Sequence, residues 1–111
     1  MTRTLAACLI AGVLAGQAVS AQVPAGAVII VLPFENPTQE PRLAWMREGA
    51  AILLTETLAA AGEIVVDREE RLQVFDRLQM PASASLSRAS TIRVGQTVGA
   101  SLVITGTVAV Q

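Results

Sequence analysis

The sequence has no histidine, no lysine and no tyrosine, and it has a single cysteine among its 111 residues. Those side chains supply most of the general bases, amine and thiol nucleophiles and metal ligands of enzymes. The single cysteine, Cys8, cannot form a disulfide within the chain. We therefore expect a non-enzymatic protein without a cofactor or a metal site.

Positive charge is also scarce. All eight basic residues are arginines, and nine acidic residues leave a net charge of −1. A nucleic-acid-binding domain usually carries a strongly basic face, and binding to anionic lipids needs a cluster of basic residues. The composition therefore indicates neither nucleic acid nor a charged membrane surface as a partner.

The amino terminus has the pattern of a secretory signal peptide. Arg3 is followed by an apolar run of 12 residues, 5–16, which is too short to span a bilayer comfortably. Val19 and Ala21 suit the −3 and −1 positions of a signal-peptidase site. We expect cleavage after Ala21, export to the periplasm or envelope, and no stable transmembrane segment after processing. A buried amino-terminal helix is the alternative interpretation.

Residues 5–8, LAAC, match the letters of a bacterial lipobox. Lipid attachment at Cys8 would leave a signal of only seven residues, without an apolar core of its own. Instead of a lipoprotein we therefore expect a signal peptide at 1–21, a short linker at 22–26 and one α/β domain at 27–111.

Three segments predict strands. Residues 27–34 form a continuous apolar run, which is typical of a strand buried on both faces. Pro33 has no amide hydrogen to donate, so regular pairing is expected to stop there. Residues 63–67 and the β-branched run 101–111 predict the second and third strands.

Three helices are expected between these strands. The spacing of the apolar residues predicts helices over 41–62, 68–78 and about 88–98. Asp67 and Ser87 directly precede the second and third helices, where short polar side chains cap the free amide groups of the first turn.

The same periodicity predicts which helical residues are buried. Arg47 and Glu48 are expected on the solvent side of the first helix, and Arg71 on a solvated face of the second. Gly49 and Gly95 lie inside predicted helices, where they indicate close approach of helix and sheet. The expected inward face of the first helix is Leu43, Met46, Ala50, Leu53 and Thr57. The residues expected to be mostly buried are Ile30, Leu32, Phe34, Leu53, Leu58, Val65, Phe75, Ile92 and Val103.

The order of these elements predicts an α/β domain of three layers, a βαβαβ arrangement with a small, mostly parallel sheet and right-handed crossovers. The first strand is the most continuously apolar, which places it between the other two in the order 2-1-3. The third strand runs to the last residue without proline or charge. Such edges are usually covered, so we expect a truncated domain whose sheet is incomplete at its carboxyl end, with self-association through strand 101–110.

Four segments occur in an order that resembles a known module: VLPFEN at 31–36, EGAAILLTETL at 48–58, VVDREERL at 65–72 and IRVGQTVGASLVITGTV at 92–108. Together they are similar to the TolB amino-terminal-type module of bacterial envelope and tetratricopeptide-repeat proteins. Related domains occur in flagellar-assembly lipoproteins and in the curli-secretion pore subunit. The resemblance covers roughly residues 27–110 and implies a three-layer α/β domain with a mixed sheet, usually of five strands.

Polar residues follow two of the predicted strands at their carboxyl ends, where open α/β sheets bind ligands. Glu35 and Asn36 follow the first strand, and Asp67 and Arg68 follow the second. These four residues form a candidate ligand or partner loop. The simpler interpretation is that Pro33 ends the strand and that Glu35 and Asn36 shape the next turn.

The resemblance implies a role in the envelope, and the residue chemistry argues against catalysis. We therefore expect an exported, non-catalytic bacterial module that acts through contact or assembly with partner proteins of the envelope. A small-molecule or nucleotide-sensing domain is the first alternative. A hydrolase with an unrecognised carboxylate site, of which Glu35 would be one member, is the second.

Overall fold

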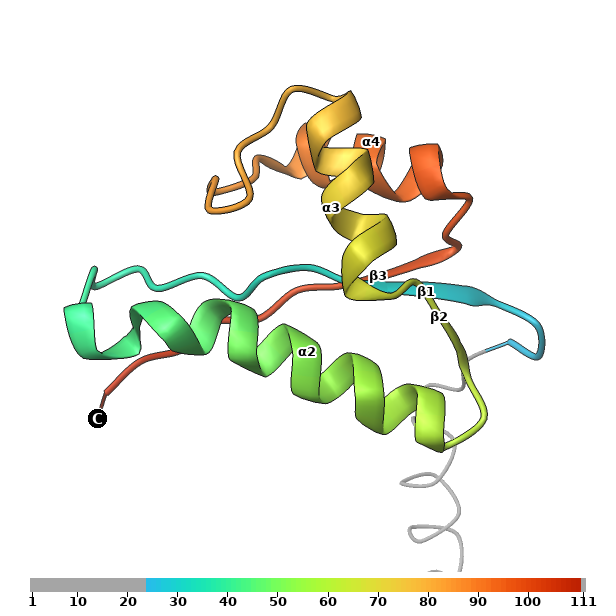
Figure 1. The fold of residues 1–111 in the computed structure, drawn as a ribbon, viewed down its shortest axis with the longest axis horizontal. Helices are drawn as coiled ribbons and strands as arrows, with labels where there is room; N and C mark the ends of the chain where they lie inside the picture. Colours follow the sequence, from blue (N-terminus) through green and yellow to red (C-terminus); the bar gives the residue numbers. More distant parts are fainter. Residues whose placement is uncertain (1–23, 111) are drawn as a thin grey trace, which may run out of the picture.

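The computed structural model describes residues 24–110 (Figure 1). The predicted signal peptide, with Cys8 and the cleavage site after Ala21, lies outside the described residues. Strands and helices alternate along the described part, and a short 3-10 helix precedes the longest α-helix. In chain order the elements are β1 (Val28–Val31), η1 (Pro41–Leu43), α2 (Ala44–Ala60), β2 (Ile64–Val65), α3 (Arg68–Arg77), α4 (Arg88–Val98) and β3 (Leu102–Ile104).

The strands form one parallel sheet in the order β2-β1-β3, as predicted. β1 pairs with β2 through Val28 opposite Ile64, and with β3 through Ile30 opposite Val103. Helix α2 covers one face of the sheet, and α3 and α4 cover the other (Figure 1). The domain is therefore a three-layer α/β fold with β1 at its centre.

The side chains of β1 and the next residue alternate between two apolar clusters. Ile30 and Leu32 face α3 and α4, whereas Ile29 and Val31 face α2 and pack against Ala51. All four side chains from the first strand region are at most 2% exposed. Because both faces of the strand are covered by helices, every position in it must be apolar, which explains the unbroken apolar run.

Regular pairing between β1 and β3 ends before Pro33, where the sequence predicts a stop. The Leu32 amide still donates to the Ile104 carbonyl, so the Pro33 nitrogen points away from β3. Val31 lies opposite Ile104, and pairing resumes where Glu35 lies opposite Thr107. The segment that continues β1 therefore contains one residue more than its partner across this interval. This arrangement is a β-bulge.

The regular strands are shorter than the apolar runs that predict them. β2 contains only two residues, and β3 ends at Ile104 instead of continuing to residue 111. The bulge interrupts the ladder, and the backbone beyond Ile104 rejoins it only through the single bridge between Glu35 and Thr107. Hydrophobicity alone does not reveal such an interruption.

The helix boundaries lie close to the predicted ones, and both predicted caps are present. The Asp67 carboxylate accepts a hydrogen bond from the Glu70 amide at 2.8 Å, and the Ser87 hydroxyl accepts one from the Ser90 amide at 3.1 Å. Within residues 24–110, no helix combines the length and the apolar character that a membrane span requires.

The inward face of α2 differs from the predicted one. Ala51 is fully buried, with Leu54 and Leu58 packed beside it against the sheet, whereas Leu53 is 66% exposed. Apolar residues occupy most of the circumference of this helix, so their spacing does not single out one face. The buried face of α2 is therefore displaced by about one residue from the predicted face, which was Leu43, Met46, Ala50, Leu53 and Thr57.

Three charged residues that were expected to face solvent lie in packed surroundings. Arg71 is 2% exposed, and Arg47 and Glu48 are half-buried. Arg71 donates hydrogen bonds to the Glu48 carboxylate, and Arg47 donates to the Phe34 carbonyl. Each charge therefore has a partner within the protein, which offsets the loss of water around it.

Three of the nine residues expected in the core are fully buried, and four are half-buried. Leu53 and Ile92 are exposed, so the prediction is wrong for these two. Ile92 lies on the outer side of α4 because this helix buries Val94 and Gly95 instead. The fully buried residues are Ile30, Leu32 and Phe75, and the half-buried ones are Phe34, Leu58, Val65 and Val103.

Candidate functional site

The strand order creates a point where the chain reverses direction across the sheet. From β1 the chain passes through α2 to β2 on one side, and from β2 it returns through α3 and α4 to β3 on the other side. In open α/β sheets, ligands bind beyond the carboxyl ends of the strands at such a switch point. In this fold that point lies between the carboxyl ends of β1 and β3.

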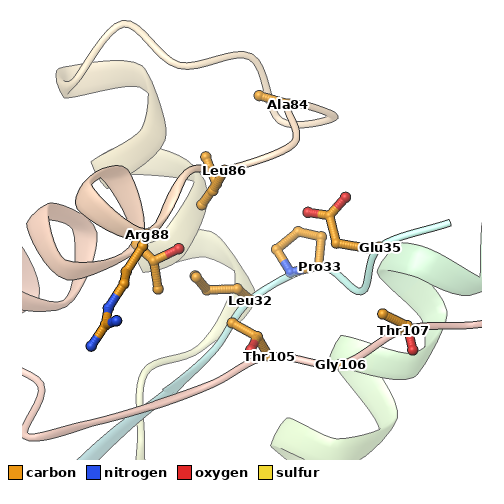
Figure 2. A pocket seen from close by; sticks show the side chains of 10 residues that line it. Leu32, Pro33, Glu35, Ala84, Leu86, Arg88, Thr105, Gly106 and Thr107 are labelled. Atoms are coloured by element: carbon orange, nitrogen blue, oxygen red, sulfur yellow. The ribbon is translucent and has the colours of Figure 1, made fainter. Parts of the chain in front are cut away.

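A cavity of about 340 Å³ occupies this point (Figure 2), and we call it the crevice. Its volume falls within the range of small-molecule sites. Its walls come from the segment after β1, the segment after β3, the loop before α4 and the first turn of α4. The lining residues are Leu32, Pro33, Glu35, Ala84, Leu86, Arg88, Thr91, Thr105, Gly106 and Thr107.

Among the described residues that line the crevice, Glu35 is the only carboxylate, and its position is held by the backbone on both sides. Its amide donates to the Gly106 carbonyl at 2.9 Å, and its carbonyl accepts from the Val108 amide at 2.8 Å. The Ser85 hydroxyl donates to its carboxylate at 2.6 Å. The side chain is therefore fixed at the mouth of the crevice and only half-buried.

Among residues 24–110, Arg88 is the only positively charged residue that lines the crevice. It is the first residue of α4, directly after the Ser87 cap, and it is exposed. Within residues 24–110 it forms no salt bridge with a carboxylate. Figure 2 places Arg88 and Glu35 on opposite sides of the apolar side chains of Leu32 and Leu86.

Arg47 and Phe34 hold the walls of the crevice together. The Phe34 amide donates to the Arg47 carbonyl at 3.0 Å, and the Arg47 Nε donates back to the Phe34 carbonyl at 2.8 Å. Arg47 Nη1 donates to the Ser83 carbonyl at 2.9 Å, which ties the loop before α4 to the bulge. A Cβ atom on Gly106 would lie 2.7 Å from the Phe34 ring, so only glycine fits there without movement.

A second, more polar cavity of about 320 Å³ lies on the other side of Glu35 and includes Asn36, Glu40 and Arg47. The Asn36 amide donates to the Glu40 carbonyl at 2.9 Å. Asn36 Oδ1 and Arg47 Nη2 are buried without a hydrogen-bond partner among residues 24–110. Both atoms need a polar partner, and a water molecule in this cavity can supply it for each.

The four predicted site residues separate into two pairs. Glu35 and Asn36 line the second cavity together, but Asp67 and Arg68 line a different one at the carboxyl end of β2. Asp67 caps α3, and Arg68 Nε donates to the Glu48 carboxylate at 3.1 Å. The structure therefore gives Asp67 and Arg68 clear structural roles, and only the Glu35 end of the predicted loop reaches the crevice.

Sequence reasoning missed the rest of the crevice. Arg88 follows the predicted Ser87 cap, but the loop before it has no pattern that brings it next to β1. Thr105 and Thr107 were assigned to the predicted strand 101–111, which extends beyond the actual end of β3 at Ile104. A strand ending before Gly106 would have placed both threonines at the carboxyl edge of the sheet, where ligands bind.

Glu48, Arg68 and Arg71 form a charged cluster outside the crevice. The Glu48 carboxylate accepts hydrogen bonds from both arginines, and Arg71 is almost fully buried. Burial raises the pKa of Glu48, but the hydrogen bonds and positive charges of Arg71 and Arg68 outweigh it and hold this pKa below its usual range. The cluster joins α2 to α3, a structural role.

Comparisons of the chain with known protein families, with curated proteins and with solved structures find no match. Among residues 24–110, no group of three or more His, Cys, Asp or Glu side chains is arranged to hold a metal ion. The site is therefore defined by its geometry alone.

Proposed function

We propose that this chain is an exported, non-catalytic module of the bacterial envelope that binds a protein partner by adding a strand to the outer edge of β3. The observation that carries this proposal is the backbone along that edge, which is unpaired within the described part of the chain. The signal-peptide pattern and the resemblance to the TolB amino-terminal-type module support the envelope location. The missing histidine, lysine and tyrosine support a role in binding instead of catalysis.

The hydrogen bonds of the β3 segment define which backbone groups face outward. The carbonyls of Ile104 and Gly106 accept from the β1 segment, and the Val108 amide donates to it. Because successive residues of a strand point their backbone groups to opposite sides, the groups of Thr105 and Thr107 face away from β1. Within residues 24–110 no strand lies on that side of β3.

The side chains of β3 are also only partly covered. Leu102 and Ile104 belong to the apolar cluster on the α2 side, and Val103 belongs to the cluster on the α4 side. All three are half-buried, whereas the equivalent residues of the central strand are fully buried. An added strand would therefore bury apolar surface on both faces as well as satisfy backbone groups.

β3 is short, which is one natural protection of a sheet edge, but its sequence carries none of the others. Natural sheet edges carry lysine, proline, inward charges or a covering element. Residues 102–110 contain no proline and no charged side chain. The edge therefore favours pairing with an extended segment.

Site-specific cross-linking tests the proposed partner surface. A photo-reactive amino acid at position 107 should give a covalent adduct of defined mass in the envelope of cells that make the protein. The same group at Thr97, an exposed threonine of α4 outside the β3 segment, serves as the matched control. Equal cross-linking at both positions, or none at 107, would contradict binding at the edge.

Mass spectrometry of the exported protein tests the proposed location. Removal of the signal peptide after Ala21 should leave Gln22 as the first residue. A product that keeps Cys8 with attached acyl chains would contradict this and would establish a lipoprotein.

A further inference from the structure

We propose that the crevice binds a short zwitterionic ligand with an apolar body, and that a dipeptide or tripeptide with free ends is its chemical class. In this arrangement Glu35 contacts the ammonium end and Arg88 contacts the carboxylate end. This ligand would lie in the crevice between the carboxyl ends of β1 and β3. Its binding does not depend on the partner strand proposed for the outer edge of β3.

Charge is the first argument. The described residues that line the crevice include one carboxylate side chain, Glu35, and one arginine, Arg88, on opposite sides of the apolar side chains of Leu32 and Leu86 (Figure 2). The Arg88 guanidinium points away from Glu35 in Figure 2, and because this side chain is exposed it is free to turn toward a ligand. Glu35 accepts a hydrogen bond from only one side chain among the described residues, the neutral hydroxyl of Ser85. A carboxylate can accept about four hydrogen bonds, so Glu35 has capacity for an ammonium group.

Arg88 has the complementary capacity. Within residues 24–110 its guanidinium takes part in no side-chain hydrogen bond and no salt bridge, and it is exposed. Its planar group can hold a carboxylate through two parallel hydrogen bonds. A ligand that carries both charges would therefore satisfy both ends of the crevice at once.

The floor of the crevice selects an apolar body. Leu32 is 2% exposed and Pro33 is buried, while Leu86 is half-buried above them. Three threonines, Thr91, Thr105 and Thr107, also line the crevice and carry hydroxyls. Each hydroxyl both donates and accepts, which suits the N–H and C=O groups of a peptide bond.

The crevice is also well organised before any ligand arrives. The backbone of Glu35 is bonded to Gly106 and Val108, and Arg47 ties the opposite loop to the bulge. Rigid walls reduce the entropy lost on binding. The same charges argue against two other ligand classes, because a polyphosphate would be repelled by Glu35 and a polyamine by Arg88.

Calorimetric titration of the purified full chain with four forms of the dipeptide Leu-Leu is the test. The free-ended peptide should bind most tightly. Acetylation of its amino end or amidation of its carboxyl end should each weaken binding about 10-fold or more, the range expected for one lost charge-assisted hydrogen bond. The form blocked at both ends should bind weakest.

Charge-removing variants then assign the two ends. In Glu35→Gln, acetylation should no longer weaken binding, while amidation still does. In Arg88→Gln the pattern should be reversed. Arg93→Gln removes an exposed arginine of the same helix outside the crevice. In this variant acetylation and amidation should each still weaken binding. Because Arg88 is exposed, its variant tests the assignment even if Glu35→Gln fails to fold.

Three results would overturn the proposal. The first is no saturable binding of the free-ended peptide at millimolar concentration. The second is equal affinity for the free and blocked forms. The third is a correctly folded Arg88→Gln variant in which acetylation and amidation of the peptide weaken binding as much as they do in the wild type.

Discussion

Two glycines that lie inside helices have opposite surroundings. A Cβ atom on Gly95 would lie 2.7 Å from the Val103 Cγ2 atom, whereas one on Gly49 would meet only the Trp45 ring, at 3.4 Å. Gly95 therefore allows α4 to approach β3 closely, and Gly49 has no such role. The predicted close approach of helix and sheet is confirmed for Gly95 alone.

Alanine substitutions should separate these two roles. Gly49→Ala should raise the free energy of unfolding by up to about 1 kcal/mol, because alanine favours the helix and meets no clash. Gly95→Ala should lower it by about 1–2 kcal/mol, because overpacking against Val103 exceeds the helix gain. Denaturant unfolding measures both. Stabilisation by Gly95→Ala would show that α4 can move away from the sheet at little cost.

Arg71 shows where residue-level prediction fails. Its neighbours in the sequence are charged, so the pattern indicates a solvated helix face, yet its side chain is 2% exposed. Its burial depends on Glu48, which lies 23 positions earlier and on another helix. A single sequence contains no signal that links these two residues, whereas the Asp67 cap was predictable because its partner is three residues away.

At the scale of elements, the pair of Glu48 and Arg71 connects α2 with α3. Glu48→Leu would leave the buried guanidinium of Arg71 without its carboxylate. We expect a loss of up to about 3 kcal/mol, at the low end for a buried pair because the Glu48 side chain is 31% exposed. Replacing both residues, by Glu48→Leu with Arg71→Met, should restore part of that loss. A double variant less stable than Glu48→Leu would contradict this account.

The same pair predicts a pH dependence. The pKa of Glu48 lies below its ordinary value of 4.5 in the folded state, so the unfolded state binds protons more readily in acid. Its stabilising contribution is therefore present above that ordinary value and is lost as the pH falls through the lower folded pKa. The difference in unfolding free energy between the wild type and Glu48→Gln should shrink in this acidic window. A difference that stays constant there would contradict the ionised pair.

Element order and type were predictable, but element faces and lengths were less so. The order of strands and helices follows from apolar periodicity and from the caps at Asp67 and Ser87. The face of α2 does not, because Ala51 and Leu53 are equally compatible with an apolar stripe. The length of β3 depends on the bulge at Pro33 in the segment after β1, which the sequence of β3 itself does not encode.

At the scale of the whole molecule, the open edge of β3 should make the protein associate. We expect light scattering to detect self-association at about 100 μM, a concentration at which exposed strand edges aggregate. Thr107→Lys should reduce it, because a charge beside the edge opposes pairing. Thr97→Lys adds the same charge on α4 and should have no effect. A monodisperse monomer for the unmodified protein would show that the edge is covered.

The whole fold was predictable because one strand is far more apolar than the others. The run at 27–34 requires helices on both faces, and this requirement places it in the centre of the sheet. The crevice was predictable only in its general place, at the carboxyl edge beside Glu35. Its second charge, Arg88, comes from a loop whose path depends on tertiary contacts such as that of Arg47 with Ser83.

The bulge after β1 also changes which face of the sheet the following side chains point to. Leu32 faces the α3 and α4 side, and in an unbroken strand the side chain three positions later would face the opposite side. The extra residue cancels this alternation, so Phe34 turns to the α2 side and Glu35 shares the crevice with Leu32. If Pro33 were instead paired as an ordinary strand residue, the Phe34 ring would face the crevice and the Glu35 carboxylate would face the apolar layer beside α2. Looping out one residue therefore keeps the Glu35 carboxylate at the crevice.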